Sequence, residues 1–115
     1  MKGHLRPEGH GYQKDYALQV VRLGYPVLVV EPLGFGERRD RELLHEPIAR
    51  SGCHAAATLA IFFGTTLASI RIHDLRRSLD FLCTVPQINP DRIGLMGISG
   101  GGQLSLWAAA IDPRF

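Results

Sequence analysis

The chain has 115 residues, of which 45% are hydrophobic and 21% charged, so its length allows one small globular domain at most. Its 13 lysines and arginines and 11 aspartates and glutamates leave a formal net charge of +2, and the two signs alternate, as they do from Glu37 to Glu42. Nucleic-acid binding normally requires basic side chains gathered on one face. We therefore expect no nucleic-acid partner.

Cysteine usage and the N-terminus favour a cytoplasmic setting. Cys53 and Cys83 are too few for a disulfide framework, although a bond between them stays open. No apolar core follows the charges of Met1–Pro7, so no signal peptide is evident, but a missing N-terminus would hide one. The uncharged run Ala55–Ile70 is shorter than the roughly 20 apolar residues of a membrane span and contains polar residues. We expect a buried segment broken near Gly64, and no membrane partner.

The first half of the chain predicts a loop over residues 1–13, then a helix and a strand. Asp15 suits a helix N-cap, and Gly24 suits the left-handed residue that ends a helix. Tyr25–Val30 predicts a strand, and its lack of alternation indicates burial on both faces, as in a parallel sheet. A long polar loop then runs to about Ser51, and a loop of that length is either functional or loosely ordered.

The second half predicts two more helices around a second strand. A threonine is expected to cap a helix that runs from Thr66 to about Val85. Its apolar face is formed by Ala68, Ile72, Leu75, Leu79 and Leu82. On the polar face, Arg76 and Asp80 have the spacing of a surface ion pair. Asn89-Pro90 marks a turn into the strand Ile93–Gly97, and a helix follows from Gly100 to about Ile111.

The order of helices and strands predicts an α/β fold with a mostly parallel, doubly wound sheet and a right-handed crossover. Both predicted strands are too apolar to be edge strands, so the sheet needs neighbours on both sides. We therefore expect residues 1–115 to form part of a larger α/β domain that is truncated at both ends.

A Gly-x-Ser-x-Gly pentapeptide lies between the second strand and the last helix. Gly97-Ile98-Ser99-Gly100-Gly101 has the layout of a nucleophile elbow, a strained strand-to-helix turn that exposes a serine hydroxyl. Gly97 and Gly101 would lack the Cβ atoms that collide where strand and helix close up. The pattern predicts Ser99 as an exposed nucleophile.

The chain resembles the α/β-hydrolase superfamily over residues 10–115, and most closely its dienelactone hydrolase and acetyl xylan esterase-like branch. The segments that carry the resemblance are Asp15–Tyr25, Val29–Arg39, Ser51–His54, Asn89–Gly94 and Gly97–Gly102. The resemblance implies the central part of that fold and a serine esterase acting on a small-molecule carboxylic ester. It also implies that Ser99 attacks the ester carbonyl and that the Gly100 N–H stabilises the resulting oxyanion.

Two departures from the family leave other functions open. Gly9-His10-Gly11 resembles the family's oxyanion loop only superficially, and only Asp112, with no histidine, follows Ser99 where the family places its acid and its base. We therefore expect the isolated chain to be inactive and prone to aggregate. A prolyl oligopeptidase-type peptidase and an inert remnant remain alternatives, and the substrate's acyl and alcohol groups and the oligomeric state stay open.

Other motifs in the chain give weaker indications. The glycines from Gly100 to Gly102 lack the Lys-Ser/Thr of a P-loop, and Gly34-Phe35-Gly36 lacks the third glycine of a dinucleotide site. Cys53-His54 with His45 or His73 matches no zinc spacing, and His73 and Asp74 point about 100° apart on a helix, which is wrong for a catalytic pair. We expect no metal and no cofactor. The stripe on the last helix, Leu104, Trp107, Ala108 and Ile111, is expected to pack in the core.

Overall fold

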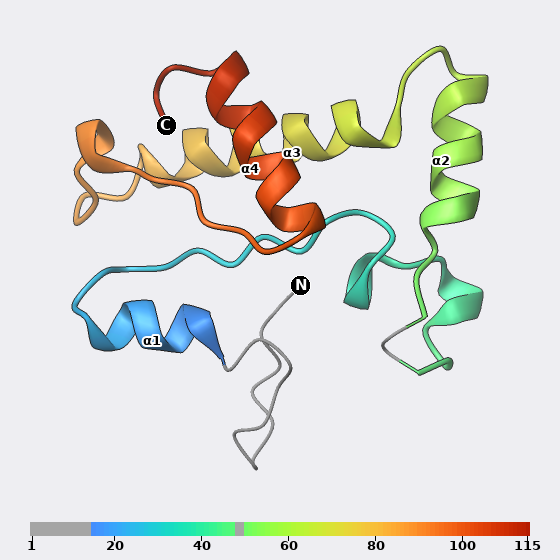
Figure 1. Ribbon diagram of the computed structural model, residues 1–115, viewed down its shortest axis with the longest axis horizontal. Coiled ribbons are helices and arrows are strands. Elements are labelled where there is room, and N and C mark those ends of the chain that lie inside the picture. The colour runs from blue at the N-terminus through green and yellow to red at the C-terminus, as the bar shows by residue number, and fades with distance from the viewer. Residues whose placement is uncertain (1–14, 48–49) are drawn as a thin grey trace.

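The computed structural model describes residues 15–47 and 50–115 and is built from helices joined by irregular segments (Figure 1). The α-helices are α1 (Tyr16–Arg22), α2 (Cys53–Phe62), α3 (Leu67–Leu82) and α4 (Gly100–Ile111). Short 3-10 helices cover η1 (Gly36–Arg38), η2 (Arg41–Leu43) and η3 (Pro90–Arg92). Helix α3 packs against both α4 and α2, so it connects the two halves of the structure.

The predicted α/β fold with a parallel sheet is wrong, because residues 15–47 and 50–115 contain no strand. Segments 25–32 and 93–97 lie where strands were expected, but no backbone hydrogen bond between them is recorded. A strand needs a neighbour about 4.8 Å away that exchanges backbone hydrogen bonds with it. The predicted burial of the first strand is also wrong, since Leu28 is 42% exposed.

The helix termini follow the capping pattern in two of three places. The Thr66 hydroxyl accepts a hydrogen bond from the Ser69 N–H at 3.0 Å, which confirms the predicted threonine cap of α3. Gly24 follows α1 with φ of 91°, as the left-handed C-terminal residue was expected to do. Asp15 occupies the N-cap of α1 but makes no side-chain capping bond.

Helix α2 is not the buried segment that was predicted. Its last turn and the residue after it carry Leu59, Ile61, Phe62 and Phe63, all more than half exposed. The predicted break is present, because Gly64 has φ of 72° and α2 and α3 meet at a bend of 98°. Within the described residues, no single helix has the length and apolar character to cross a membrane; α2 and α3 meet that test only as a bent pair.

The buried apolar side chains of the described residues lie on three helices. They are Ala60 of α2, Leu79 of α3, and Leu104 and Ala108 of α4. The predicted core stripe of α4 is therefore right for Leu104 and Ala108, whereas Trp107 and Ile111 are 39% and 58% exposed. The core is the contact between α3 and its two neighbours.

A charge cluster ties the end of α4 to α3. Asp112 is only 3% exposed, and its carboxylate accepts hydrogen bonds from Arg76 Nε at 3.1 Å and from Arg114 Nε at 2.9 Å. Asp80 pairs with Arg114 and Arg77, so the expected Arg76–Asp80 pair does not form. The hydrogen bond from Arg114, supported by Arg76, holds the pKa of Asp112 well below its usual range. The bond from Arg114 also lowers the pKa of Asp80.

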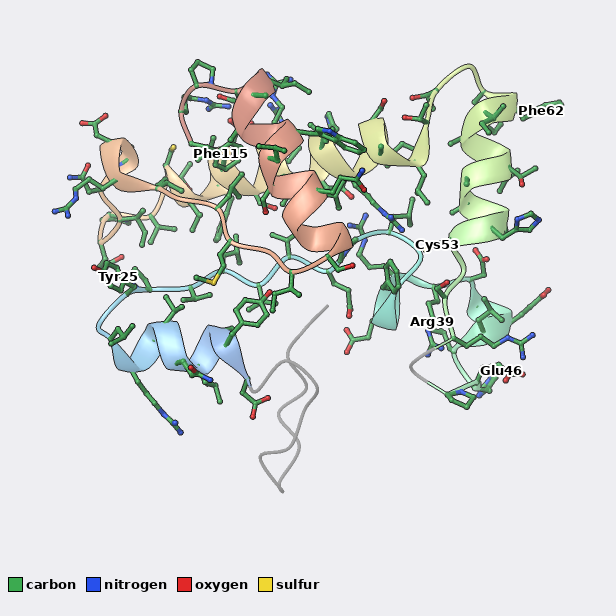
Figure 2. The ribbon with its side chains drawn as sticks, in the orientation of Figure 1. Tyr25, Arg39, Glu46, Cys53, Phe62 and Phe115 are labelled. Atoms are coloured by element: carbon green, nitrogen blue, oxygen red, sulfur yellow. The ribbon has the colours of Figure 1, made fainter. Side chains whose placement is uncertain are left out.

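The Arg39 side chain connects several backbone carbonyl groups of the polar loop that follows segment 25–32. Arg39 donates hydrogen bonds to the carbonyl oxygens of Gly36, Glu46, Pro47 and Arg50 at 2.8–3.2 Å (Figure 2). A guanidinium carries five donors in a fixed plane, so it can satisfy several carbonyl groups of a loop that lacks regular structure.

Candidate active site

Ser99 has the most unusual backbone of the candidate site residues. It lies immediately before α4 with φ of 54° and ψ of −122°, and apart from glycines, only Asp15 also has a positive φ among the described residues. Such a conformation costs a non-glycine residue on the order of 1–3 kcal/mol and persists where the surrounding structure enforces it. The turn is closed by a hydrogen bond of 3.0 Å from the Gly101 N–H to the Ile98 carbonyl oxygen.

The two glycines of the pentapeptide are not equivalent. A Cβ atom on Gly97 would lie 2.2 Å from the backbone carbon of Gly101, which no packing adjustment can accommodate. A Cβ atom on Gly101 would meet nothing within 4 Å. The close approach of segment 93–97 to the first turn of α4 therefore requires glycine at position 97, whereas the predicted requirement at position 101 is wrong.

The Ser99 hydroxyl is not used to cap the helix that it precedes. A serine at an N-cap usually accepts a hydrogen bond from an N–H in the first turn, but Ser99 makes no such bond. The residue is exposed, in agreement with the sequence prediction. Within the described part of the chain, no acceptor is recorded for the Gly100 N–H, as is usual for the first residue of a helix. A hydroxyl and a backbone donor therefore stand side by side.

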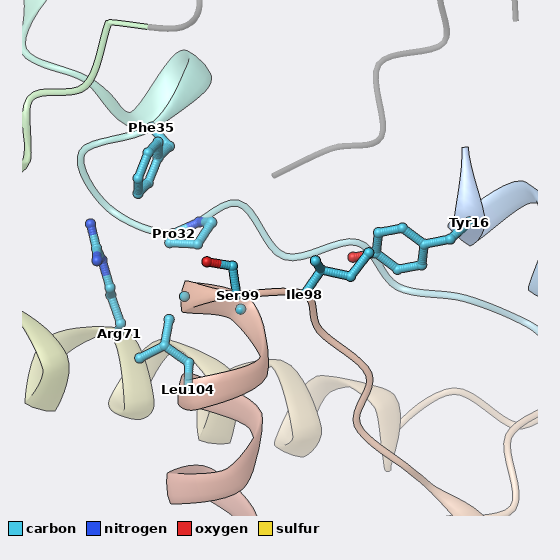
Figure 3. Close-up of a pocket in the computed structure, with 9 residues that line it drawn as sticks. Tyr16, Pro32, Phe35, Arg71, Ile98, Ser99 and Leu104 are labelled. Carbon is cyan, nitrogen blue, oxygen red and sulfur yellow. The ribbon is translucent and has the colours of Figure 1, made fainter. Parts of the chain in front are cut away.

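Ser99 and Gly100 open into a pocket of about 280 Å³. Its other walls come from α1, segment 25–32 and the turn that follows it, α3, the turn before α4, and α4 itself. The residues are Tyr16, Pro32, Phe35, Arg71, Ile98, Gly101 and Leu104. Figure 3 shows Ser99 between Pro32 and Leu104, with Arg71 and Phe35 on one side and Ile98 and Tyr16 on the other. The pocket is small and its lining is mainly apolar, with Ser99, Arg71 and Tyr16 as its polar side chains.

Arg71 holds one wall of this pocket. Its Nε donates to the Leu33 carbonyl oxygen at 3.0 Å, and its Nη2 donates to the same oxygen and to Cys53 Sγ. The guanidinium carbon also lies 5.2 Å from the centre of the Phe35 ring, which is within cation–π range. One side chain of α3 therefore fixes the turn beside Ser99 and contacts the first residue of α2.

The turn at Gly34–Gly36 is fixed by its neighbours as well as by Arg71. Gly34 has φ of 89°, and its carbonyl oxygen accepts a hydrogen bond of 2.8 Å from the Gly52 N–H. A Cβ atom on Gly36 would overlap the Glu31 carboxylate at 1.9 Å. Gly34 therefore allows close packing against the Cys53 backbone, and Gly36 adopts a positive φ of 52°, as expected for a turn rather than a dinucleotide site.

The structure does not bring the candidate acid–base residues to Ser99. Among the described residues, no histidine lines the pocket, and Asp112 does not line it either, because its carboxylate is held by arginines. The Gly9-His10-Gly11 segment lies outside the described residues. In the same part of the chain, no group of three or more His, Cys, Asp or Glu side chains is arranged to hold a metal. Cys53 and Cys83 are both free thiols.

Sequence reasoning missed three pocket residues, namely Tyr16, Phe35 and Arg71. One signal for Arg71 was available, because it is the first charged residue after the uncharged run Ala55–Ile70. A charge at the edge of such a run indicates either exposure or a specific contact. Tyr16 and Phe35 carry no comparable signal, since aromatic residues in short helices and turns are common.

Comparisons with known proteins find two relatives, each similar to this chain over part of its own length. No protein-family model and no solved structure matches it. It is 33% identical over 109 residues, 93% of this chain, to a Bacillus subtilis protein named "Putative hydrolase YtaP", and it spans 33% of that protein's length. It is also 40% identical over 45 residues, 39% of this chain and 12% of the relative, to the Pseudomonas aeruginosa "Uncharacterized protein PA2218". The first of these relatives is named as a putative hydrolase, and the similarity does not single out the dienelactone hydrolase branch.

Proposed function

We propose that this protein is a serine hydrolase that cleaves carboxylic esters, with Ser99 as the nucleophile. The observation that carries the proposal is the strained backbone of Ser99 at the start of α4, with its hydroxyl uncapped and open to a pocket. Strain of this kind recurs at catalytic residues, where the surrounding structure enforces it. The similarity to a protein named as a hydrolase supports the same class of reaction.

The proposed chemistry begins with attack of Ser99 Oγ on the ester carbonyl. The C–O bond to the alcohol then breaks, the alcohol leaves with a proton, and water hydrolyses the acyl-serine to release the acid. The Gly100 N–H, at the positive end of α4, donates to the oxyanion that forms, and such a donor is typically worth about 3–4 kcal/mol in the transition state. A general base must accept the proton of the hydroxyl. No residue is assigned to that role, because no histidine lines the pocket within the described part of the chain.

Hydrolysis of 4-nitrophenyl acetate by the full-length protein, to which residues 1–115 are expected to belong, tests the proposal with a matched pair of variants. Ser99→Ala should lower kcat/KM by at least about 10³-fold, since removal of a nucleophile leaves only the residual contributions of binding and the oxyanion donor. Ser105→Ala is the control, because Ser105 lies on the same helix with its hydroxyl bonded to the Gly101 carbonyl oxygen at 2.9 Å. Equal rates in Ser99→Ala and the unmodified protein would refute the proposal.

A further inference from the structure

We infer that the rings of Tyr16 and Phe35 limit the length of the two halves of the ester, one ring for the acyl chain and the other for the alcohol. The inference rests on the proposed function, because it assigns the substrate size of the pocket that contains Ser99. It starts from the origin of the two rings, which line that pocket from different elements. Tyr16 is the first residue of α1, and Phe35 immediately precedes η1.

The two rings lie on opposite sides of Ser99. Figure 3 shows Tyr16 and Ile98 on one side of this serine. On the other side lie Phe35 and Arg71. The acyl chain and the alcohol of an ester extend from the carbonyl carbon in different directions. An ester whose carbonyl carbon is attacked by Ser99 Oγ therefore directs one half toward Tyr16 and the other toward Phe35.

Both rings are held by their surroundings. The Phe35 ring centre lies 5.2 Å from the guanidinium carbon of Arg71. The first turn of α1, which carries Tyr16, is closed by a hydrogen bond of 2.8 Å from the Leu18 N–H to the Asp15 carbonyl oxygen. Both aromatic side chains are also partly buried. A wall that is held in place excludes a chain that is too long, because making room for it requires neighbouring groups to shift.

The Tyr16 ring, and not its hydroxyl, forms this wall. Across residues 15–47 and 50–115, no hydrogen bond of the Tyr16 hydroxyl is recorded. Loss of the hydroxyl therefore leaves the ring supported as before, whereas loss of the ring opens that end of the pocket. A phenylalanine at this position should impose the same limit on chain length.

The volume of the pocket leaves room for short chains only. About 280 Å³ is at the small end of the range for ligand sites, and both halves of the ester share it. Pro32, Ile98 and Leu104 form apolar side walls, which favour a hydrocarbon chain without fixing its length. The rings of Tyr16 and Phe35 are therefore the groups that determine where each chain must end.

Two isomeric esters, ethyl octanoate and octyl acetate, test the inference with ethyl acetate as the reference and with the full-length protein to which residues 1–115 are expected to belong. The isomers have the same composition, but they carry the long chain on opposite sides of the carbonyl. In the unmodified protein, the kcat/KM of each isomer should be lower than that of ethyl acetate by about tenfold or more, as expected when a chain is too long for its pocket. Acid release in a pH-stat measures the rates.

The two rings should act on different isomers. Tyr16→Ala should raise the kcat/KM of one isomer relative to ethyl acetate by about tenfold or more, and Phe35→Ala should do so for the other isomer. Tyr16→Phe should keep the ratios of the unmodified protein. Tyr25→Ala is the control, because it removes a tyrosine that is 60% exposed and does not line the pocket, and it should also keep the ratios. If Tyr16→Ala does not fold, Tyr16→Leu shortens the same side chain and should shift the same isomer.

The outcomes separate this inference from the proposed function. If Ser99→Ala is inactive but Tyr16→Ala and Phe35→Ala keep the ratios of the unmodified protein, the nucleophile stands and the inference is overturned. A gain on the same isomer in both variants would also overturn it, and so would equal kcat/KM values for all three esters in the unmodified protein. A shift in Tyr16→Phe as large as in Tyr16→Ala would assign the effect to the hydroxyl and overturn the limit on size. Full activity of Ser99→Ala would overturn the nucleophile and the inference together.

Discussion

The helices of this protein and its two non-helical apolar segments contain similar residue types, but they differ in how far their side chains are buried. Helices α3 and α4 bury Leu79, Leu104 and Ala108, whereas Val27, Leu28 and Val29 of segment 25–32 are each about 40% exposed. A helix satisfies its backbone hydrogen bonds within itself, and it needs a neighbour only for its side chains. An apolar extended segment needs a neighbour for both. Hydrophobic content alone therefore does not determine which parts of the chain form the core.

The largest difference between the two regions should come from truncating one leucine in each. Leu79 is 1% exposed, so Leu79→Ala should lower the free energy of unfolding by about 2–5 kcal/mol. Leu28→Ala should cost about 1 kcal/mol or less, because that side chain is already 42% exposed. Urea unfolding of both variants measures the difference, and similar losses would show that segment 25–32 is packed as tightly as the helices.

Where segment 93–97 meets α4, we expect only one of the two glycines of the pentapeptide to be necessary for stability. Gly97→Ala should cost about 1–3 kcal/mol, because its Cβ atom would overlap the backbone of Gly101. Gly101→Ala should be neutral or stabilise the protein by up to about 1 kcal/mol, since it replaces glycine in a helix without a clash. Thermal unfolding of the two variants measures the difference. A greater loss of stability in Gly101→Ala than in Gly97→Ala would refute the close approach at Gly97.

The helix N-caps should differ by a smaller amount. Thr66→Ala should cost about 1 kcal/mol, because it removes the hydroxyl that accepts a hydrogen bond from the Ser69 N–H. Asp15→Ala should change stability by less than half of that, since Asp15 makes no capping bond to α1. Helix content and unfolding midpoints, followed by circular dichroism, check this pair. Equal losses would mean that Asp15 caps α1 in solution.

The smallest of these effects on stability should come from a change of pH between 7 and 5. The pKa of Asp112 is lowered in the folded protein, so the stability that it contributes is complete above the ordinary carboxylate pKa near 3.8 and is lost as the pH falls below it. Unfolding midpoints should therefore change little through Asp112 between pH 7 and pH 5 and fall in stronger acid. Asp112→Asn should be less stable at neutral pH and less sensitive to acid, and an unchanged acid response would contradict the cluster.

The sequence predicts the local features of this structure well and its long-range pairing poorly. The Thr66 cap, the left-handed Gly24, the limits of α4 and the exposure of Ser99 all depend on a few neighbouring residues, and all are present. The sheet was wrong because a strand depends on hydrogen bonds to residues far away in the sequence, which strand propensity cannot supply.

The site divides in the same way. The pentapeptide around Ser99 is continuous in sequence, so its turn could be predicted from residue types alone. Arg71 lies beside it only because α3 packs against α4 and because Leu33 offers its carbonyl oxygen. Ion pairing was mispredicted for the same reason, since Asp112 takes Arg76 from the nearer Asp80. The features of the site that the sequence did not predict are mostly contacts between elements far apart in the chain.

The central claim, that Ser99 is the nucleophile, is tested most directly by covalent labelling of the full-length protein to which residues 1–115 are expected to belong. A serine-directed fluorophosphonate reacts with an activated hydroxyl, and peptide mass spectrometry locates the modified residue. We expect one adduct, on Ser99, with labelling abolished in Ser99→Ala and retained in Ser105→Ala. The claim would be contradicted if the unmodified protein were not labelled. It would also be contradicted if Ser99→Ala were labelled to the same extent as the unmodified protein, at another residue.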